Sequence, residues 1–260
     1  MKQVVIALTV SGLLGGCGAA GIANSIDSNS GDNGGSGGSA TTTAEGLWRG
    51  TTDTNRSVTG VVLHDGTFYV LYSAAGNPSV IAGVVQGSGT SNNGSLSSSN
   101  AKDFNLEGHV VYPVTVSASY YVKQSLNGQV TSVNPPSGTV SFTSTYDSSY
   151  EVTPTISALV GTYLGQVATS GGVESVTLTV NSSGVISGTG ASGCAASGTV
   201  ATRSDGNIYD FSIAFGGAPC QLANQTLIGI AYYNSITHFL YGAAPNASRT
   251  DGVLFVGSKQ

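Results

Sequence analysis

Residues 198–215 read GTVATRSDGNIYDFSIAF, and this stretch decides the fold class. Two strand-like runs flank Asp205-Gly206, a dipeptide that favours a tight hairpin turn. In the second run apolar side chains alternate with small or polar ones, so they share one face of the strand. They are Tyr209, Phe211, Ile213 and Phe215. Such a face predicts a β-sandwich or β-barrel that closes over an apolar core.

Strand signals continue through the rest of 158–260. An alternating run at 176–180 ends at an Asn-Ser-Ser-Gly turn. Further strands are expected at 227–233, 238–241 and 253–257. Because convincing helical periodicity is absent from the whole sequence, the chain is predicted to be all-β.

Residues 46–157 carry two predicted hairpins, a further strand at 140–145 and a polar stretch. The hairpins have Asp65-Gly66 and Asn127-Gly128 as their turns. They pair 58–63 with 68–72, and 114–122 with 129–133. Residues 88–100 are polar and of low complexity, which predicts a long exposed loop.

A short phrase recurs in the two halves of the sequence. Gly46-Leu47-Trp48-Arg49-Gly50 and Gly161-Thr162-Tyr163-Leu164-Gly165 each place an aromatic residue between two glycines. This spacing predicts two small antiparallel β-barrel or sandwich domains, at 46–157 and 158–260. Two strand sets that share one core are the alternative.

Composition and charge exclude some partners. Only 8% of the residues are charged and 38 of 260 are Gly, so the surface must be covered by Ser, Thr, Asn and Gly. The formal net charge of −5 does not indicate a positively charged surface that binds nucleic acid. No Lys/Arg cluster is present to hold an anionic membrane surface.

Residues 1–16 have the parts of a secretory signal peptide: a positive charge, a short apolar run and small residues before Cys17. The apolar run is shorter than the roughly 20 residues that span a bilayer. Leu14-Gly15-Gly16-Cys17 resembles the lipobox of bacterial lipoproteins. The resemblance implies that the leader is removed and that lipids on Cys17 anchor the protein, since two or more acyl chains give stable membrane binding. A plain secretory signal with an ordinary Cys17 is the alternative.

The residue after Cys17 is Gly18, whereas an aspartate there is the usual inner-membrane retention signal of bacterial lipoproteins. The resemblance therefore implies the outer membrane, on its periplasmic or surface-exposed face. Residues 17–45 are rich in Gly, Ser, Asn and Thr and contain no aromatic residue. They are expected to form a flexible, disordered tether between the lipidated cysteine and the folded chain.

With Cys17 lipidated, Cys194 and Cys220 remain as a pair. In an oxidising compartment a disulfide is the natural assignment. It would join the open ends of the hairpin at 198–215. A metal site is the alternative, but neither cysteine has a His, Cys or carboxylate at ligand spacing.

Three segments of the second half carry a further resemblance: Gly161-Thr162-Tyr163, GGAPC at 216–220 and RTDGVLFVG at 249–257. They are similar to segments of uncharacterised two-domain β lipoproteins of beta-proteobacteria, and the likeness covers most of the mature chain. The resemblance supports the expected outer-membrane location and the expected fold. That group carries no activity to transfer.

No constellation of residues predicts catalysis. His64, His109 and His238 are scattered, without a second histidine at ligand spacing. GTGASG at 188–193 fits GxGxxG, but a strand-like run follows it where a dinucleotide site needs a helix. SNAK at 99–102 fits SxxK but lacks the companion motifs.

The acidic residues Asp65, Asp205 and Asp251 lie beside glycines in predicted turns, where Asp favours the backbone conformation. Glu107 is expected on a solvated strand face. We therefore predict a non-enzymatic protein with no catalytic residue, no metal and no cofactor.

Tyrosine pairs offer a route to binding, because Tyr120-Tyr121 and Tyr232-Tyr233 would each place one ring on either face of a strand. An outward ring could anchor a protein or glycan partner. The leading hypothesis is a lipid-anchored binding module that meets an unknown partner through loops such as 88–100.

A lipocalin-like carrier is the second hypothesis, in which a barrel interior lined by Tyr209, Phe211 and Ile213 holds a small apolar ligand. It requires a cavity of a few hundred Å³. A hydrolase, the least favoured hypothesis, requires carboxylate and histidine side chains that converge in one cleft.

Overall fold

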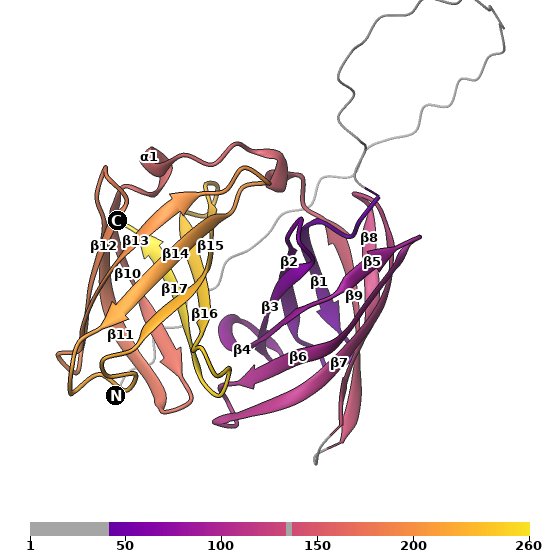
Figure 1. Ribbon diagram of the computed structural model, residues 1–260, viewed down its shortest axis with the longest axis horizontal. Coiled ribbons are helices and arrows are strands. Elements are labelled where there is room, and N and C mark those ends of the chain that lie inside the picture. Colours follow the sequence, from indigo (N-terminus) through magenta and orange to yellow (C-terminus); the bar gives the residue numbers. More distant parts are fainter. Residues whose placement is uncertain (1–41, 134–136) are drawn as a thin grey trace, which may run out of the picture. The chain divides into compact units, whose positions relative to one another are not determined.

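The structure is a computed structural model that describes residues 42–133 and 137–260 (Figure 1). The expected signal peptide, Cys17 and residues 17–41 of the expected tether lie outside these residues. The described chain is all-β, as predicted, apart from α1 (Ile156–Leu159) and a 3-10 turn, η1 (Ser148–Glu151). Neither helix of the described chain is long and apolar enough to cross a membrane.

The first half forms an antiparallel barrel in which strands follow one another up and down. Its strands are β1 (Gly46–Thr52), β2 (Ser57–Val62), β3 (Thr67–Ala74), β4 (Asn77–Ser88), β5 (Thr90–Asn92), β6 (Ser95–Asn105), β7 (Val110–Tyr121), β8 (Ser125–Ser132) and β9 (Gly138–Tyr146). The sheet order is β4-β3-β2-β1-β9-β8-β7-β6-β5, and pairing of β4 with β6 closes the ring. Because β5 also pairs with β6, β4 and β5 together fill one position of this ring.

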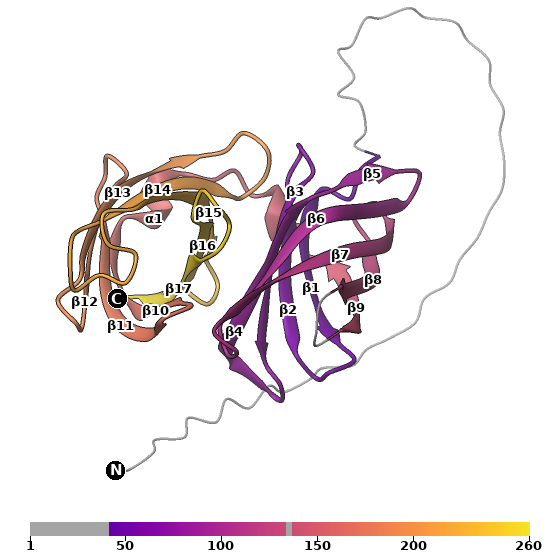
Figure 2. The same ribbon diagram turned by 60° about the horizontal axis from the view of Figure 1, so that its bottom comes forward.

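The second half forms a closed barrel of strands in chain order, which Figure 2 shows nearly end-on. Its strands are β10 (Gly161–Thr169), β11 (Gly172–Val180), β12 (Val185–Gly190), β13 (Ala195–Thr202), β14 (Tyr209–Phe215), β15 (Thr226–Asn234), β16 (Phe239–Pro245) and β17 (Gly252–Lys259). Pairing of β10 with β17 closes the ring. The hairpin across Asp205-Gly206 is present as predicted, and Tyr209, Ile213, Phe211 and Phe215 contribute to the interior core.

Trp48 and Tyr163 occupy equivalent places at the start of the two barrels. Each lies two residues after a glycine with a φ of 148° and is buried, with exposed fractions of 2% and 0%. The Trp48 Nε1 donates a hydrogen bond to the Ala44 carbonyl at 3.0 Å, and the Tyr163 hydroxyl donates one to the Leu159 carbonyl at 2.7 Å. The recurring sequence phrase therefore marks the same local structure in both barrels.

Each barrel has its own apolar interior, centred on Phe68 and Trp48 in the first and on Tyr163 and Ile213 in the second. A third buried cluster contains side chains from both barrels. The strands supply to it Leu47, Val61, Tyr69, Val84, Phe104, Ala168, Ile230, Tyr232, Ala243 and Leu254. The two halves thus have separate cores and one shared apolar interface.

Two expectations for the first half are wrong. Tyr121 pairs with Ser125, so the turn between β7 and β8 lies at 122–124 and Asn127-Gly128 lies inside β8. A Cβ on Gly128 would lie 2.4 Å from the Ser117 carbonyl oxygen. The glycine is needed for the close approach of the neighbouring strand and not for a turn.

Residues 88–100 do not form a long loop. They contain β5, the start of β6 and a two-residue turn at Asn93-Gly94, whose φ values are 47° and 79°. Two positive φ angles are the signature of a type I′ hairpin turn. Polar residues on the solvent face of a strand explain the low-complexity composition.

Cys194 and Cys220 form the disulfide that the sequence predicts, with a sequence separation of 26. It joins the segment before β13 to the segment after β14. Both cysteines are buried.

Candidate functional site

The interior of the first barrel contains a cavity of about 330 Å³, which we call the chamber. Small-molecule sites in proteins have volumes of about 300–1,000 Å³, so the chamber lies at the lower end of that range. Its wall is mostly apolar and comes from every strand of the first barrel except β5. The apolar lining residues are Trp48, Val58, Val62, Phe68, Val70, Val85, Leu96, Val116, Leu126, Val130, Val140 and Phe142.

One end of the chamber is closed by the chain that leads into β1. Ala44 is 0% exposed and accepts the hydrogen bond of the Trp48 indole. The Tyr120 hydroxyl donates to the Thr42 carbonyl at 2.7 Å, which fixes the same segment from β7. Residues 42–45, which the sequence places in the flexible tether, therefore contact the barrel and seal this end.

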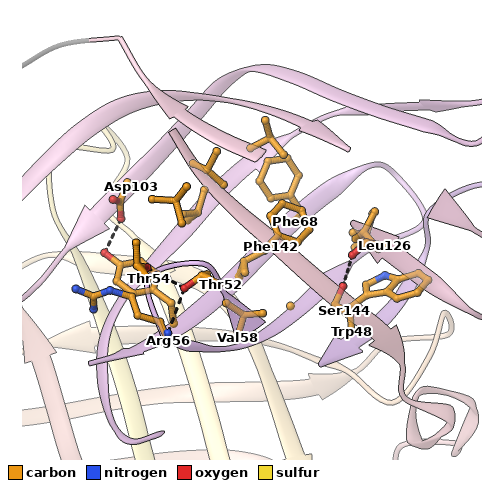
Figure 3. Close-up of a pocket in the computed structure, with 18 of the residues that line it drawn as sticks. Trp48, Thr52, Thr54, Arg56, Val58, Phe68, Asp103, Leu126, Phe142 and Ser144 are labelled. Carbon is orange, nitrogen blue, oxygen red and sulfur yellow. Dashed lines mark hydrogen bonds between the residues drawn. The ribbon is translucent and has the colours of Figure 1, made fainter. Parts of the chain in front are cut away.

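The opposite end of the chamber opens to solvent, because the exposed residues Thr54 and Ala75 take part in its lining. We call this end the mouth. In Figure 3, Thr52, Thr54, Arg56 and Asp103 gather at the mouth, and Trp48, Leu126 and Ser144 lie at the closed end. Phe68 and Phe142 lie between the two groups.

A polar cluster of three side chains occupies the mouth. The Tyr72 hydroxyl donates to Asp103 Oδ1 at 2.7 Å (Figure 3). The Arg56 guanidinium carbon lies 5.5 Å from the centroid of the Tyr72 ring, in a cation–π contact. Arg56 also donates to the Ser73 carbonyl at 2.8 Å and to Glu107 Oε2 at 2.9 Å. The three groups therefore hold one another in place at the edge of an apolar interior.

Burial dominates the electrostatics of Asp103. It raises the pKa of this carboxyl to about 6, while the Tyr72 hydroxyl and Arg56 act in the opposite direction. Burial also raises the pKa of Tyr72 far above its ordinary value, with the Asp103 charge acting in the same direction. Tyr72 therefore stays protonated and remains a hydrogen-bond donor to Asp103.

Gly83 on β4 makes room for the cluster. A Cβ at this position would lie 2.3 Å from the Tyr72 hydroxyl oxygen and 2.5 Å from the Phe104 carbonyl oxygen. Any larger residue would push the Tyr72 hydroxyl away from Asp103. The glycine thus helps to position the donor of the Tyr72–Asp103 hydrogen bond.

The second barrel offers far less space. Its interior cavity is about 90 Å³, and the side chains around it include Phe211, Ile213 and Phe255. Tyr209 is 1% exposed and belongs to the packed core. The expectation that a ligand occupies the barrel lined by Tyr209, Phe211 and Ile213 is therefore corrected: the space for a ligand is in the first barrel.

The three histidines do not come together. His64 bonds Glu45 at 3.0 Å, His109 bonds the Ser170 carbonyl at 2.7 Å, and His238 bonds the Tyr233 hydroxyl at 3.0 Å. Glu107 lies in the turn after β6, not on a strand face, and pairs with Arg56. Within the described residues, no group of three or more His, Cys, Asp or Glu could hold a metal ion.

The segments that fit GxGxxG and SxxK lie in strands and turns. Residues 188–193 include the end of β12 and the turn before Cys194, and no helix follows them. Residues 99–102 lie inside β6. Neither segment has the helix that its motif requires.

Both tyrosine pairs place one ring on either face of their strand, as predicted, but only the first pair places a ring in solvent. Tyr120 is 4% exposed and Tyr121 is 72% exposed, so one ring faces the interior and the other faces solvent. Tyr232 and Tyr233 are both 6% exposed. Tyr233 belongs to the interior core of the second barrel, and Tyr232 belongs to the interface cluster.

Asp103, Tyr72 and Arg56 are not among the residues that the sequence singles out. On β6 the regular alternation of inward-facing and outward-facing residues is interrupted, because the pairing with β7 shifts register between Ser98 and Ala101. Leu96 and Asp103 both line the chamber although they are seven residues apart. Simple alternation places two residues with an odd separation on opposite faces. On β3, in contrast, the alternation of Phe68, Val70 and Tyr72 does indicate a shared inner face.

Comparisons with known proteins give only distant similarities. No family model matches the chain, and no curated protein matches it. Among solved structures, it is similar to transferrin binding protein B of serogroup B Neisseria meningitidis, with 11% identity and a TM-score of 0.29 over 79% of this chain and 65% of that chain. A variant of transferrin binding protein B from Haemophilus parasuis gives 11% identity and a TM-score of 0.28, covering 79% of this chain and 51% of that chain.

A third structure, of a Bacteroides fragilis protein, gives 15% identity and a TM-score of 0.25 over 83% of this chain and 96% of that chain. The chain spans less than two thirds of the length of the two transferrin binding proteins. At these identities and TM-scores, the resemblance carries no argument about the function of this chain.

Proposed function

We propose that this protein is a lipid-anchored envelope protein that holds a small, largely apolar molecule in the chamber of its first barrel. The chamber carries the proposal, because it is about 330 Å³ in volume, apolar along its length and open at one end. A folded protein rarely keeps an apolar space of this size without a ligand, since interiors are otherwise close-packed. The proposed role is binding or carriage and involves no chemical step.

The anchor is proposed from the sequence of residues 14–17, and outer-membrane location is proposed from the absence of Asp at position 18. The described chain enters the first barrel at the closed end of the chamber, through residues 42–45. A tether from Cys17 would therefore join the barrel opposite the mouth.

Binding of a protein or glycan partner through exposed loops is the second candidate function. It has less support, because residues 88–100 form a hairpin and the Tyr232 ring is buried in the interface cluster. Tyr121 is the one ring of the two tyrosine pairs that faces solvent, with 72% exposure. A partner surface centred on Tyr121 would have no connection to the chamber.

The binding test uses the whole chain with Cys17→Ser, which lacks the lipid and needs no detergent that could compete for the chamber. Trp48 is the single tryptophan of the chain and lines the chamber. Energy transfer from Trp48 to the neutral apolar dye N-phenyl-1-naphthylamine therefore reports dye bound in the neighbourhood of Trp48. We expect saturable transfer, which would be absent if the chamber does not bind apolar molecules.

Two matched variants locate the bound dye. Val130 lines the chamber and Val176 lines the smaller cavity of the second barrel. Val130→Phe should weaken dye binding at least about tenfold by filling the chamber, whereas Val176→Phe should leave it unchanged. Equal loss in both variants, with both folded by circular dichroism, would contradict a site in the first barrel.

The anchor needs a separate experiment, in which cells are labelled with a palmitate analogue. The natural protein should take up the label and stay in the membrane fraction, and the Cys17→Ser protein should do neither. Label and membrane retention in the Cys17→Ser protein would refute the anchor without affecting the binding proposal.

A further inference from the structure

The polar cluster at the mouth leaves one carboxylate oxygen available. Tyr72 donates to Asp103 Oδ1, and no residue of the described chain donates a hydrogen bond to Oδ2. Oδ2 is also not sealed in the protein, because the fully buried polar atoms without a partner in the described chain are Gln86 Oε1 and Arg249 Nε. Asp103 lines the chamber, as does Val85, with which it pairs on β4, so its side chain lies on the inner face of β6.

Asp103 forms no ion pair within the described chain, although the charge of Arg56 acts to lower its pKa. Arg56 and Asp103 are the charged residues in the described lining of the chamber. Arg56 donates its Nη2 to Glu107 at 2.9 Å and its Nη1 to the Ser73 carbonyl at 2.8 Å. The lining thus has one carboxylate and one guanidinium, and the guanidinium is already engaged by Glu107 and the Ser73 carbonyl.

A ligand in this chamber must match both an apolar wall and an acidic mouth. Between the mouth and Trp48 the wall of the chamber is apolar and includes Phe68 and Phe142. This part of the chamber suits the alkyl or aromatic part of a ligand. A carboxylate or phosphate head group would meet the Asp103 carboxylate and would be repelled. An ammonium group would instead add a charge-assisted hydrogen bond to Oδ2.

We infer that the chamber selects small amphipathic amines, whose ammonium group donates to Asp103 Oδ2 and whose apolar body extends toward Trp48. This inference rests on the proposed binding function and names the ligand class. Tyr72 is the positioning residue, because its hydroxyl fixes Oδ1 and leaves Oδ2 directed at the ligand. Gly83 leaves space for that hydroxyl.

Amine binding is also expected to depend on pH. The charged and titratable groups that surround Asp103 are Tyr72 on β3, Arg56 before β2 and Glu107 after β6. In the empty chamber the pKa of Asp103 is about 6, whereas an alkylamine stays protonated up to about pH 10. Affinity for the amine should therefore fall as the pH drops below 6 and Asp103 becomes neutral.

The test compares octylamine, octanol and octanoate, which share one chain length and differ in head-group charge. Their dissociation constants are measured on the Cys17→Ser protein by displacement of N-phenyl-1-naphthylamine, with Trp48 as the energy donor. At pH 7.5 octylamine should bind about tenfold more tightly than octanol, in line with one hydrogen bond to a charged group. Octanoate should bind most weakly.

Two carboxylate variants provide the control. Asp103→Asn keeps the size of the side chain and the acceptor for Tyr72, and it should make octylamine and octanol bind equally. Asp210→Asn removes a carboxylate from the outer face of the second barrel and should keep the tenfold preference. At pH 5 the protein with Asp103 should lose most of its preference for octylamine over octanol, while its affinity for octanol stays constant.

The outcomes separate the two proposals. If the dye and all three compounds fail to bind, the proposed function itself is wrong. If octanol or octanoate binds as tightly as octylamine, or if Asp103→Asn keeps the preference, the chamber binds apolar molecules but the inference of an amine ligand is wrong.

Discussion

Asp103 shows how a single residue can give an apolar barrel a polar preference. Its carboxyl lies inside the ring, accepts one hydrogen bond from Tyr72 and has Arg56 nearby. Burial nevertheless outweighs both favourable contacts and raises its pKa to about 6. A group that is costly to keep ionised in the empty protein is typical of a binding site, where a ligand supplies the missing partner.

Replacement of Asp103 by Asn should stabilise the empty protein. The folded-state pKa of about 6 exceeds the ordinary value of 3.8, so the folded state binds more protons than the unfolded state between pH 4 and 6. This contribution to stability is present below about pH 4 and is lost as the pH rises through 6. Asp103→Asn should therefore raise the free energy of unfolding at pH 7.5 by about 1–3 kcal/mol, with a smaller gain at pH 4.5.

Urea denaturation at the two pH values measures this difference. Equal gains at pH 4.5 and 7.5 would show that Asp103 is not the group that titrates. A loss of stability at pH 7.5 would show that its ionised form is well compensated in the empty chamber.

Gly83 provides a second test at this scale, because its Cβ would meet the Tyr72 hydroxyl oxygen at 2.3 Å and the Phe104 carbonyl oxygen at 2.5 Å. Gly83→Ala should lower the free energy of unfolding by about 1–3 kcal/mol, as overpacked sites do. Gly138→Ala is the matched control, since no atom of the described residues lies within 4 Å of a Cβ there, and it should change stability by less than about 0.5 kcal/mol. Similar effects of both substitutions would argue against the packing around Tyr72.

At the scale of strands and turns, alternation and turn chemistry predict much of this fold. The hairpins across Asp65-Gly66 and Asp205-Gly206 form because an apolar alternating run flanks each dipeptide. The same dipeptide signal fails at Asn127-Gly128, where the glycine serves a close strand contact. A local sequence cannot distinguish these two uses of Gly, since both require the absence of a Cβ.

Bulges explain why the candidate site was harder to predict than the fold. The register shift between Ser98 and Ala101 changes which side of β6 faces inward, and the sequence contains no marker for it. Trp48 could be located from the recurring glycine-framed phrase, and Phe68 from its strand. Asp103 could not, because its inward direction depends on the irregular pairing of β6 with β7.

The disulfide makes a prediction for the β13–β14 hairpin. Cys194 and Cys220 are 26 residues apart, and closure of a loop of that length stabilises the folded state by about 3 kcal/mol through loss of unfolded-state entropy. A Cys194→Ala and Cys220→Ala double variant should lose this amount in chemical denaturation. The intact mass of the natural protein without reductant should be lower than with reductant by the mass of two hydrogen atoms, and free thiols at both positions would refute the bond.

At the scale of the whole described chain, the two barrels are joined by an apolar interface with polar contacts at its edge. The Arg49 guanidinium carbon lies 5.6 Å from the centroid of the Tyr232 ring, and Arg49 also donates to the Tyr232 hydroxyl at 3.1 Å. Asp147 forms an ion pair with the same arginine. An interface of this kind should make the barrels unfold together.

Tyr232→Ala tests the coupling, because Tyr232 lies in the second barrel and the single tryptophan, Trp48, lies in the first. Loss of this buried ring should lower the free energy of unfolding reported by Trp48 fluorescence by about 2–4 kcal/mol. Tyr121→Ala removes a ring that is 72% exposed and should change it by less than about 0.5 kcal/mol. An unchanged Trp48 transition in the Tyr232→Ala protein would mean that the barrels unfold independently.

The most direct test of a ligand chamber in the first barrel is a crystal structure of the Cys17→Ser protein soaked with octanol. We predict density for one alkyl chain between Phe68 and Phe142, with its hydroxyl near Asp103 and no octanol inside the second barrel. A first barrel whose interior is filled by rearranged side chains, or octanol bound only outside it, would contradict the account.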